Sequence, residues 1–325
     1  MKTLQSVGLA LLVLLFMSGC VLLEEPPQNG LVTVESTISG EDSVQQTVDQ
    51  LVTNLEAKGL TVMAVVNHGE NAANVELELP PTQLIIFGNP NLGTQLMNNS
   101  QSVAIDLPQK YLVWADPSSG KTFVSYNGVP YLVNRHGLTG PDEVLNTVTG
   151  ALANFANSVA ESKQSRLLPE IGIDQEKVVS TLLFARTAHA QESNGLVVVD
   201  GACSVDETVA VLESTIAERG LNVMAIVNHT ANAAKVEREL RPTQVILFGN
   251  PRVGTPLMQA SRTVGIDLPQ KMLVWEDEAG DVHLAYNDPH YLQDRHDITE
   301  RDEVLTRVGG ALSGIAEAGS QCSNE

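Results

Sequence analysis

Two stretches of this chain, GLTVMAVVNH at residues 59–68 and GLNVMAIVNH at residues 220–229, differ at only two positions. Outward from them, the same short motifs follow in the same order in both places. These motifs are FGNP at 87–90 and 248–251, IDLPQK at 105–110 and 266–271, and RH at 135–136 and 295–296. The copies extend over about 31–160 and 195–321, which is far longer than one unit of a solenoid repeat. Each copy is therefore expected to fold as a complete domain.

The hydrophobic pattern predicts helices at the ends of each copy and strands between them. In the first copy we expect a strand at 31–34, a helix from 44 that ends at Gly59, strands at 62–66, 83–87, 111–114 and 122–126, and a closing helix at 142–160. Ser204 and Glu207 form a capping-box pattern at the start of the corresponding first helix of the second copy. Strands bracketed by helices predict an α+β fold, with an antiparallel sheet covered on one side.

The first 20 residues indicate export. Lys2 is followed by an apolar run at 9–17 that is too short to span a bilayer, as in a signal peptide covering residues 1–19. The sequence MSGC at 17–20 resembles the bacterial lipobox, so Cys20 is the expected lipid attachment site, and a plain secretory signal is the alternative. Val21 after this cysteine resembles lipoproteins sent to the periplasmic face of the outer membrane. Residues 20–30 would form a tether, 161–194 a linker between the copies, and 322–325 a tail.

The composition of the chain restricts the kinds of molecule that it can bind. The 325-residue chain has a net charge of −20 and a pI near 4.6. This charge argues against binding to nucleic acid and against peripheral binding to anionic lipid. The predicted contact with the membrane is therefore through the lipid anchor only. With Cys20 assigned to the lipid, Cys203 and Cys322 are left in a compartment where disulfides persist, and we predict that they pair.

The repeated motifs resemble a known family. FGNP at 87–90, IDLP at 105–108, VW at 113–114 and YN at 126–127, with a fuller match in FGNPRVGTPLM at 248–258, are similar to the bacterial family catalogued as domain of unknown function 302. The resemblance implies a TATA-binding-protein-like fold, which is a curved antiparallel sheet with helices on one face. It also implies that single domains pair, so the two tandem copies here are expected to pack together as a pseudo-dimer. It implies no activity.

Polar residues retained in both copies are the candidate binding residues. They are His68, Asn89, Asp106, Arg135 and His136 in the first copy, and His229, Asn250, Asp267, Arg295 and His296 in the second. The ends of adjacent strands often lie on one edge of a sheet, so we expect each set to gather there. Asn89 and Asn250 lie in Gly-Asn-Pro turns that either cradle an anion or simply end a strand. The histidines lack the spacing of common metal sites, so no metal or cofactor is predicted.

Two functional hypotheses remain open. The first is a non-enzymatic lipoprotein of the cell envelope that binds a small molecule or a protein partner. The alternative is an envelope hydrolase or lyase that uses His68 and Asp106, with their counterparts, for acid-base chemistry. A pocket that holds the histidines beside Asp106 would favour the enzyme.

Overall fold

The computed structural model describes residues 29–140, 142–160 and 194–322. The predicted signal peptide, the lipid-attachment residue Cys20, nearly all of the tether and linker, and residues 323–325 of the tail lie outside the described residues. Within the described part of the chain, no helix combines the length and apolarity that crossing a membrane requires.

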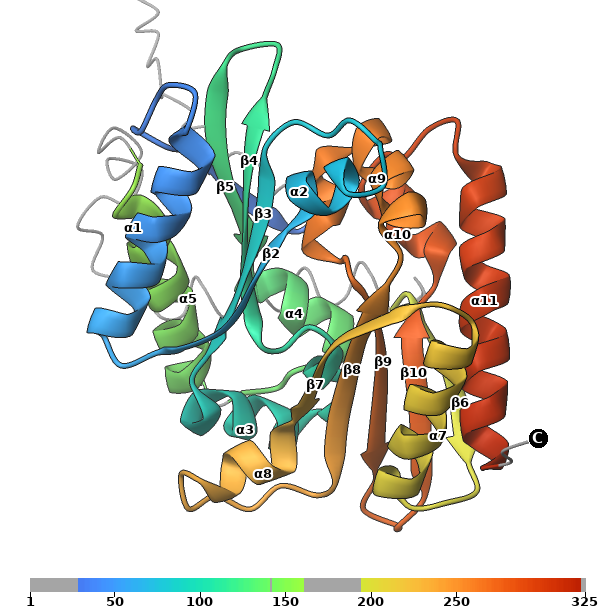
Figure 1. The fold of residues 1–325 in the computed structure, drawn as a ribbon. Coiled ribbons are helices and arrows are strands. Elements are labelled where there is room, and N and C mark those ends of the chain that lie inside the picture. The colour runs from blue at the N-terminus through green and yellow to red at the C-terminus, as the bar shows by residue number, and fades with distance from the viewer. Residues whose placement is uncertain (1–28, 141, 161–193, 323–325) are drawn as a thin grey trace, which may run out of the picture.

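Each repeat contains a five-stranded antiparallel sheet (Figure 1). The strand order is β1-β5-β4-β3-β2 in the first repeat and β6-β10-β9-β8-β7 in the second. The strands of the first sheet are β1 (Leu31–Glu35), β2 (Thr61–Asn67), β3 (Thr82–Gly88), β4 (Gln109–Asp116) and β5 (Lys121–Asn127). Those of the second are β6 (Leu196–Gly201), β7 (Asn222–Asn228), β8 (Thr243–Gly249), β9 (Gln270–Glu276) and β10 (Val282–Asn287). The predicted α+β fold in two tandem copies is therefore confirmed.

Helices connect and cover these strands. The first repeat has α1 (Ser43–Ala57), α2 (His68–Ala73), α3 (Pro90–Asn99), the 3-10 helix η1 (Gln101–Ile105), α4 (Val129–His136) and α5 (Asp142–Asn157). The second has α7 (Val205–Glu218), α8 (His229–Ala234), α9 (Pro251–Ala260), the 3-10 helix η3 (Arg262–Ile266), α10 (Pro289–Arg295) and α11 (Asp302–Gln321). The capping box of Ser204 and Glu207 is present at α7, and Gly59 follows α1 with a φ of +73°, a conformation that glycine adopts without strain.

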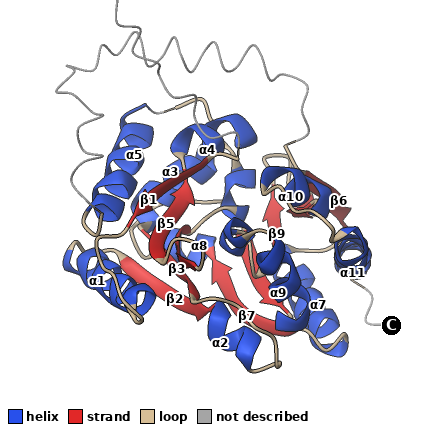
Figure 2. Cartoon of the chain, turned by 90° about the horizontal axis from the view of Figure 1, so that it is seen from above, coloured by secondary structure: helices blue, strands red, loops and turns tan. Residues whose placement is uncertain are grey.

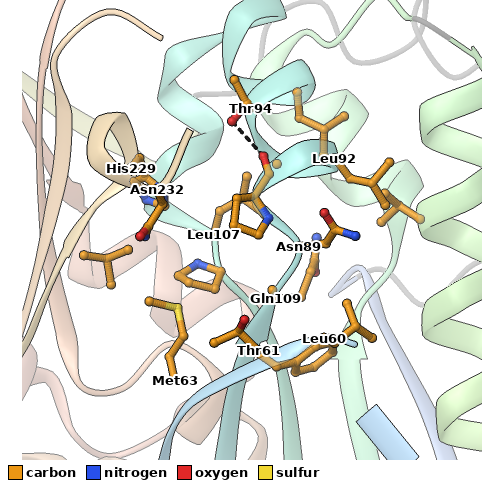
Figure 3. A pocket seen from close by; sticks show the side chains of 18 of the residues that line it. Leu60, Thr61, Met63, Asn89, Leu92, Thr94, Leu107, Gln109, His229 and Asn232 are labelled. Atoms are coloured by element: carbon orange, nitrogen blue, oxygen red, sulfur yellow. Dashed lines mark hydrogen bonds between the residues drawn. The ribbon is translucent and has the colours of Figure 1, made fainter. Parts of the chain in front are cut away.

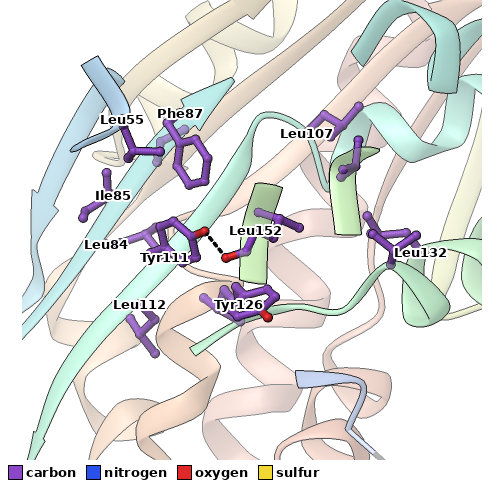
Figure 4. Close-up of a cluster of buried hydrophobic side chains, with 14 of the residues drawn as sticks. Leu55, Leu84, Ile85, Phe87, Leu107, Tyr111, Leu112, Tyr126, Leu132 and Leu152 are labelled. Carbon is purple, nitrogen blue, oxygen red and sulfur yellow. Dashed lines mark hydrogen bonds between the residues drawn. The ribbon is translucent and has the colours of Figure 1, made fainter. Parts of the chain in front are cut away.

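The outer face of each sheet packs against its own long helices. Figures 1 and 2 show α1 and α5 on one side of the molecule and α7 and α11 on the other, with the sheets between them. In the first repeat Tyr111 stacks on Phe87 and donates a hydrogen bond of 2.7 Å to the carbonyl of Leu152 in α5 (Figure 4). The tyrosine hydroxyl therefore has a partner in a layer that is otherwise apolar.

The inner faces of the sheets form the contact between the repeats. Along β8, Ile246 and Phe248 join the cluster under α7 and α11, whereas Val245 and Leu247 join the apolar cluster of the first repeat. This alternation follows from the two-residue period of a strand. Because a single apolar cluster crosses from one repeat to the other, the two copies pack as a pseudo-dimer, in agreement with the expected fold.

Polar contacts repeat across this interface. Gln101 in η1 donates a hydrogen bond to the hydroxyl of Thr243, at 2.9 Å. Its counterpart Arg262 in η3 donates to the hydroxyl of Thr82, at 3.2 Å. The equivalent placement of these pairs shows that the repeats are related by an approximate twofold axis.

The predicted disulfide between Cys203 and Cys322 is present, with the two Cα atoms 6.3 Å apart. It joins the segment after β6 to the end of α11 and so closes the second repeat on itself.

Candidate functional site: a buried polar centre and two pockets

Three of the candidate residues in each repeat meet at a buried polar centre. Oδ2 of Asp106 accepts a hydrogen bond of 2.9 Å from Nη1 of Arg135 and lies 2.7 Å from Nε2 of His136. The other ring nitrogen of His136 lies 3.0 Å from the hydroxyl of Ser102. Arg135 and His136 are the last residues of helix α4, and Asp106 caps the C-terminal end of η1. The packing of these two elements brings Asp106 together with Arg135, 29 positions away in sequence, and with His136, 30 positions away.

The second repeat builds the same arrangement. Oδ2 of Asp267 lies 2.7 Å from Nη1 of Arg295 and 2.9 Å from Nε2 of His296. The arginines then cross the interface, because Nη2 of Arg135 donates to Oδ1 of Asn287 and Nη2 of Arg295 donates to Oδ1 of Asn127, both at 2.7 Å. Each repeat therefore supplies hydrogen-bond acceptors for the arginine of the other.

Two lysines also belong to this centre. Nζ of Lys271 is 3.1 Å from Asp267 and 3.7 Å from Asp106, so one ammonium group faces both carboxylates. Lys110 instead donates hydrogen bonds of 2.9 Å to the carbonyls of Asp106 and Pro108. Burial, followed by repulsion from Lys271, lowers the pKa of Lys110 to about 7. The centre thus contains charges of both signs, with most hydrogen-bonding groups satisfied.

The side chains of this centre are shielded from solvent. Those of Asp106 and His136 have 0% exposure, and that of Arg135 has 1%. Burial alone would raise the pKa of Asp106, but Arg135, the hydrogen bond from His136, and Lys271 together hold it well below its usual value. The carboxylate is therefore charged. Its Oδ2 contacts Arg135 and His136, whereas its Oδ1 is buried without a hydrogen-bond partner among the described residues and lies 3.7 Å from Nζ of Lys271. Chemically, the arrangement joins the two repeats and offers no open position to a substrate.

His68 and Asn89 lie away from this centre. The expectation that all the candidate residues of a repeat gather at one edge of its sheet is therefore wrong. His68 and His229 begin the short helices α2 and α8, and each crosses the repeat interface. Nε2 of His68 lies 3.2 Å from the carbonyl of Gly265 in the second repeat. Asn89 and Asn250 cap α3 and α9 by accepting hydrogen bonds from the backbone of Asn91 and Arg252. The histidine of one repeat therefore faces the Gly-Asn-Pro turn of the other.

A pocket lies at each of the two places where the histidine of one repeat faces the Gly-Asn-Pro turn of the other. The larger, pocket 1, encloses about 200 Å³ between α3, the segment at 107–109 and α5 of the first repeat and α8 of the second (Figure 3). Mostly apolar side chains line it, and its polar lining includes Asn89, Gln109, His229 and Asn232. Nε2 of Gln109 and Nε2 of His229 are buried and have no hydrogen-bond partner among the described residues. The backbone of Ala104 raises the pKa of His229 against the effect of burial, and Ala104 stands at the position equivalent to Gly265, whose carbonyl faces His68.

Pocket 2 is the counterpart on the other side of the approximate twofold axis. It encloses about 140 Å³, and His68 and Asn71 of α2 meet Asn250, Thr255 and Gln270 there. Oγ1 of Thr255 and Oε1 of Gln270 are buried without a partner among the described residues. Both pockets thus need residues from both repeats, and both contain polar atoms that a bound molecule could satisfy.

The buried histidines predict loss of stability in acid. Burial lowers the pKa of His68 and of His229 from 6.5 to about 4. Between these values the unfolded chain binds more protons than the folded one, so stability is fully present above pH 6.5 and falls as the pH drops towards 4. Each histidine contributes about 1.4 kcal/mol per pH unit within that window. Urea unfolding measured at intervals from pH 7 to pH 4.5 checks this result.

The matched variant for that experiment is His68→Asn with His229→Asn. It removes two of the titrating groups, so the dependence of unfolding free energy on pH should become shallower. His136 and His296 also have lowered pKa values because of burial, and they would sustain the remaining slope. A slope unchanged by the double substitution would contradict the assignment to His68 and His229.

Sequence reasoning missed Lys110, Lys271, Asn127 and Asn287 as members of the polar centre. A signal was present, because these lysines and asparagines stand in the repeated motifs IDLPQK and YN. Among the described residues, no three or more His, Cys, Asp or Glu side chains are arranged to hold a metal ion.

This architecture defines a class of tandem α+β proteins in which paired sheets share a polar centre and two interface pockets. Residues 34–155 and 197–315 match the family described as "Domain of unknown function DUF302", and the chain belongs to that family. The resemblance noted from the motifs is thereby confirmed.

Curated relatives match part of the chain. "Fluoride-specific ion channel FluC 1" of Brucella suis biovar 1 (strain 1330) is 45% identical over 115 residues, which is 35% of this chain and 45% of the relative. A protein of the same title in Brucella abortus biovar 1 (strain 9-941) is also 45% identical over 115 residues, covering 35% of this chain and 43% of the relative. The chain therefore spans less than half the length of these relatives. The crystal structure of an uncharacterized conserved DUF302 protein from Bacillus stearothermophilus aligns with a TM-score of 0.36 and 18% identity, covering 38% of this chain and 97% of that one.

Proposed function

We propose that this chain is a non-enzymatic binding protein that holds a small, mostly apolar molecule in each of the two pockets between its repeats. The observation that carries the proposal is pocket 1, where an apolar space of about 200 Å³ is lined by Gln109, whose buried Nε2 has no partner among the described residues. Ligand pockets commonly combine an apolar lining with a few polar groups that fix orientation. The enclosed volume favours a small molecule over a protein segment.

The rival hydrolase or lyase receives less support from the geometry. It requires His68 and Asp106 to act together, but His68 lines pocket 2 while the Asp106 carboxylate is buried against Arg135 and His136. A general base must reach the proton that it removes, either directly or through one water. Asp106 is enclosed by protein on all sides and is better suited to holding the repeats together.

The proposed setting is the cell envelope, with Cys20 carrying the lipid and the protein on the periplasmic face of the outer membrane. The disulfide between Cys203 and Cys322 supports export, because such bonds persist in oxidising compartments. In this setting the linked repeats would bind their ligand while the lipid keeps them at the membrane surface.

Filling pocket 1 should remove the binding site for a probe of the size of a substituted benzene. Ala151 of α5 lines pocket 1, and its replacement by phenylalanine places a ring in the apolar space. We expect isothermal titration calorimetry with the neutral probe 2-phenylethanol to give one site per chain, at pocket 1, for the unmodified protein. Pocket 2, at about 140 Å³, is smaller than the ~150 Å³ cavity that holds benzene. For Ala151→Phe the site at pocket 1 should be lost.

The matched control is Ala311→Phe in α11. Ala311 is the counterpart of Ala151, is half-buried to a similar degree, and is not among the residues that line pocket 2. This variant should keep the site at pocket 1. Absence of binding to the unmodified protein, or unchanged binding in Ala151→Phe, would contradict the proposed function.

A further inference from the structure

The two pockets are not equivalent in charge. Lys235 follows α8 and lines pocket 1, beside Asn232 and His229. The position that corresponds to Lys235 in the first repeat is Asn74, and the described residues that line pocket 2 include no charged side chain. The repeats therefore place a cation at one pocket and a neutral amide near the other.

The polar groups around pocket 1 favour an acceptor. Nζ of Lys235 donates a hydrogen bond of 3.1 Å to Oδ1 of Asn232, which holds the ammonium group beside the pocket and leaves it further protons to donate. Nε2 of Gln109 is a buried amide donor without a partner among the described residues. Among the described residues that line this pocket there is no Asp or Glu.

A carboxylate is the natural complement to this set, because it accepts hydrogen bonds and carries the opposite charge to Lys235. The net charge of the whole chain is −20, so the surrounding field repels anions. An anion bound here needs a local cation. Lys235, the one lysine among the described residues that line pocket 1, matches a single negative charge. A ligand with several negative charges would be left mostly uncompensated.

The volume limits the apolar part of the ligand. A cavity of about 150 Å³ is large enough for benzene, and pocket 1 encloses about 200 Å³. The space therefore fits an aromatic ring with a short arm, or an aliphatic chain of similar bulk. Leu92, Leu107 and Met63 surround this space with apolar atoms (Figure 3).

We propose that pocket 1 binds a small monocarboxylate whose body is about the size of a substituted benzene ring, with the carboxylate directed to Lys235 and Asn232. The proposal rests on the function proposed above and adds the chemical class of the ligand. Pocket 2, whose described lining residues include no cation, takes a smaller neutral molecule. The duplicated pocket thus has two specificities within one chain.

The test compares phenylacetate with the neutral probe 2-phenylethanol in calorimetric titrations of the full chain. Lys235→Asn gives pocket 1 the residue found at the matching position near pocket 2. We expect it to weaken phenylacetate binding by about threefold to tenfold, as for a charge-assisted contact partly screened by solvent, and to leave 2-phenylethanol unaffected. Raising the salt concentration should weaken phenylacetate binding only when Lys235 is present.

A control variant completes the design. Lys121→Asn makes the same chemical change at the first residue of β5, away from the residues that line either pocket, and should leave phenylacetate binding unchanged.

The outcomes separate the two proposals. Phenylacetate binding that is as tight in Lys235→Asn as in the unmodified protein overturns the carboxylate assignment. Binding of 2-phenylethanol without any binding of phenylacetate also overturns it, and leaves the function as a binding protein intact. If neither probe binds, both proposals fail.

Discussion

Replacing Asp106 by asparagine is expected to lower the free energy of unfolding by about 3–5 kcal/mol, because it leaves buried positive charge without its partner. Arg135 would lose its 2.9 Å ion pair, and Lys271 would lose the more distant of its two carboxylates, at 3.7 Å. Asparagine has nearly the same shape as aspartate. The decrease in unfolding free energy therefore results from the removed charge and not from a change in side-chain volume. Urea unfolding at pH 7 measures the effect.

Two comparisons establish the origin of that loss. Asp49→Asn changes an exposed aspartate on α1 in the same way and should alter stability little. In a double-mutant cycle, Asp106→Asn and Arg135→Gln should together destabilise the protein by clearly less than the sum of the single effects. Additive effects would show that the ion pair does not couple the two side chains.

Much of the fold could be predicted because its signals are local. Gly59 ends α1 with a positive φ, and the capping box of Ser204 and Glu207 starts α7, as the sequence alone indicated. The short helices α2 and α8 were missed, since the apolar pattern of β2 and β7 continues up to them. Asn67 begins the first of these helices by accepting a hydrogen bond from the backbone of Glu70. Asparagine is one of several residues that commonly cap helices, so before a helix of only six residues it is a weak sequence signal for the start of that helix.

The candidate site was harder to predict because it is assembled across the interface. Asp106, Arg135 and His136 lie within one repeat, and the sequence contained enough to suggest that they approach one another. His68 contacts Gly265 of the other repeat, however, at a sequence separation of 197 residues. Internal periodicity shows that two copies exist, but it contains no information about which loops of one copy reach into the other. The crossed pairing of His229 with the turn at Asn89 became visible only in the packed pair.

Removing the disulfide with Cys203→Ser and Cys322→Ser is expected to lower the stability of the second repeat by about 4–5 kcal/mol. The two cysteines are 119 residues apart, so the bond closes almost the whole repeat into one loop. An open loop of that length has more conformations in the unfolded chain, and folding must then overcome the additional entropy. Thermal and urea unfolding of the full chain measure the change.

The first repeat provides an internal reference, because it contains no cysteine between residues 31 and 160. If the shared polar centre couples the repeats, unfolding of the double serine variant should remain one cooperative transition at a lower midpoint. Trp114 and Trp275 report on the two repeats separately when each is replaced in turn by phenylalanine. Coincident transitions at both tryptophans would show that the loss in the second repeat is transmitted across the interface. A transition confined to Trp275 would show that the repeats unfold independently, and an unchanged midpoint would contradict a stabilising role for the disulfide.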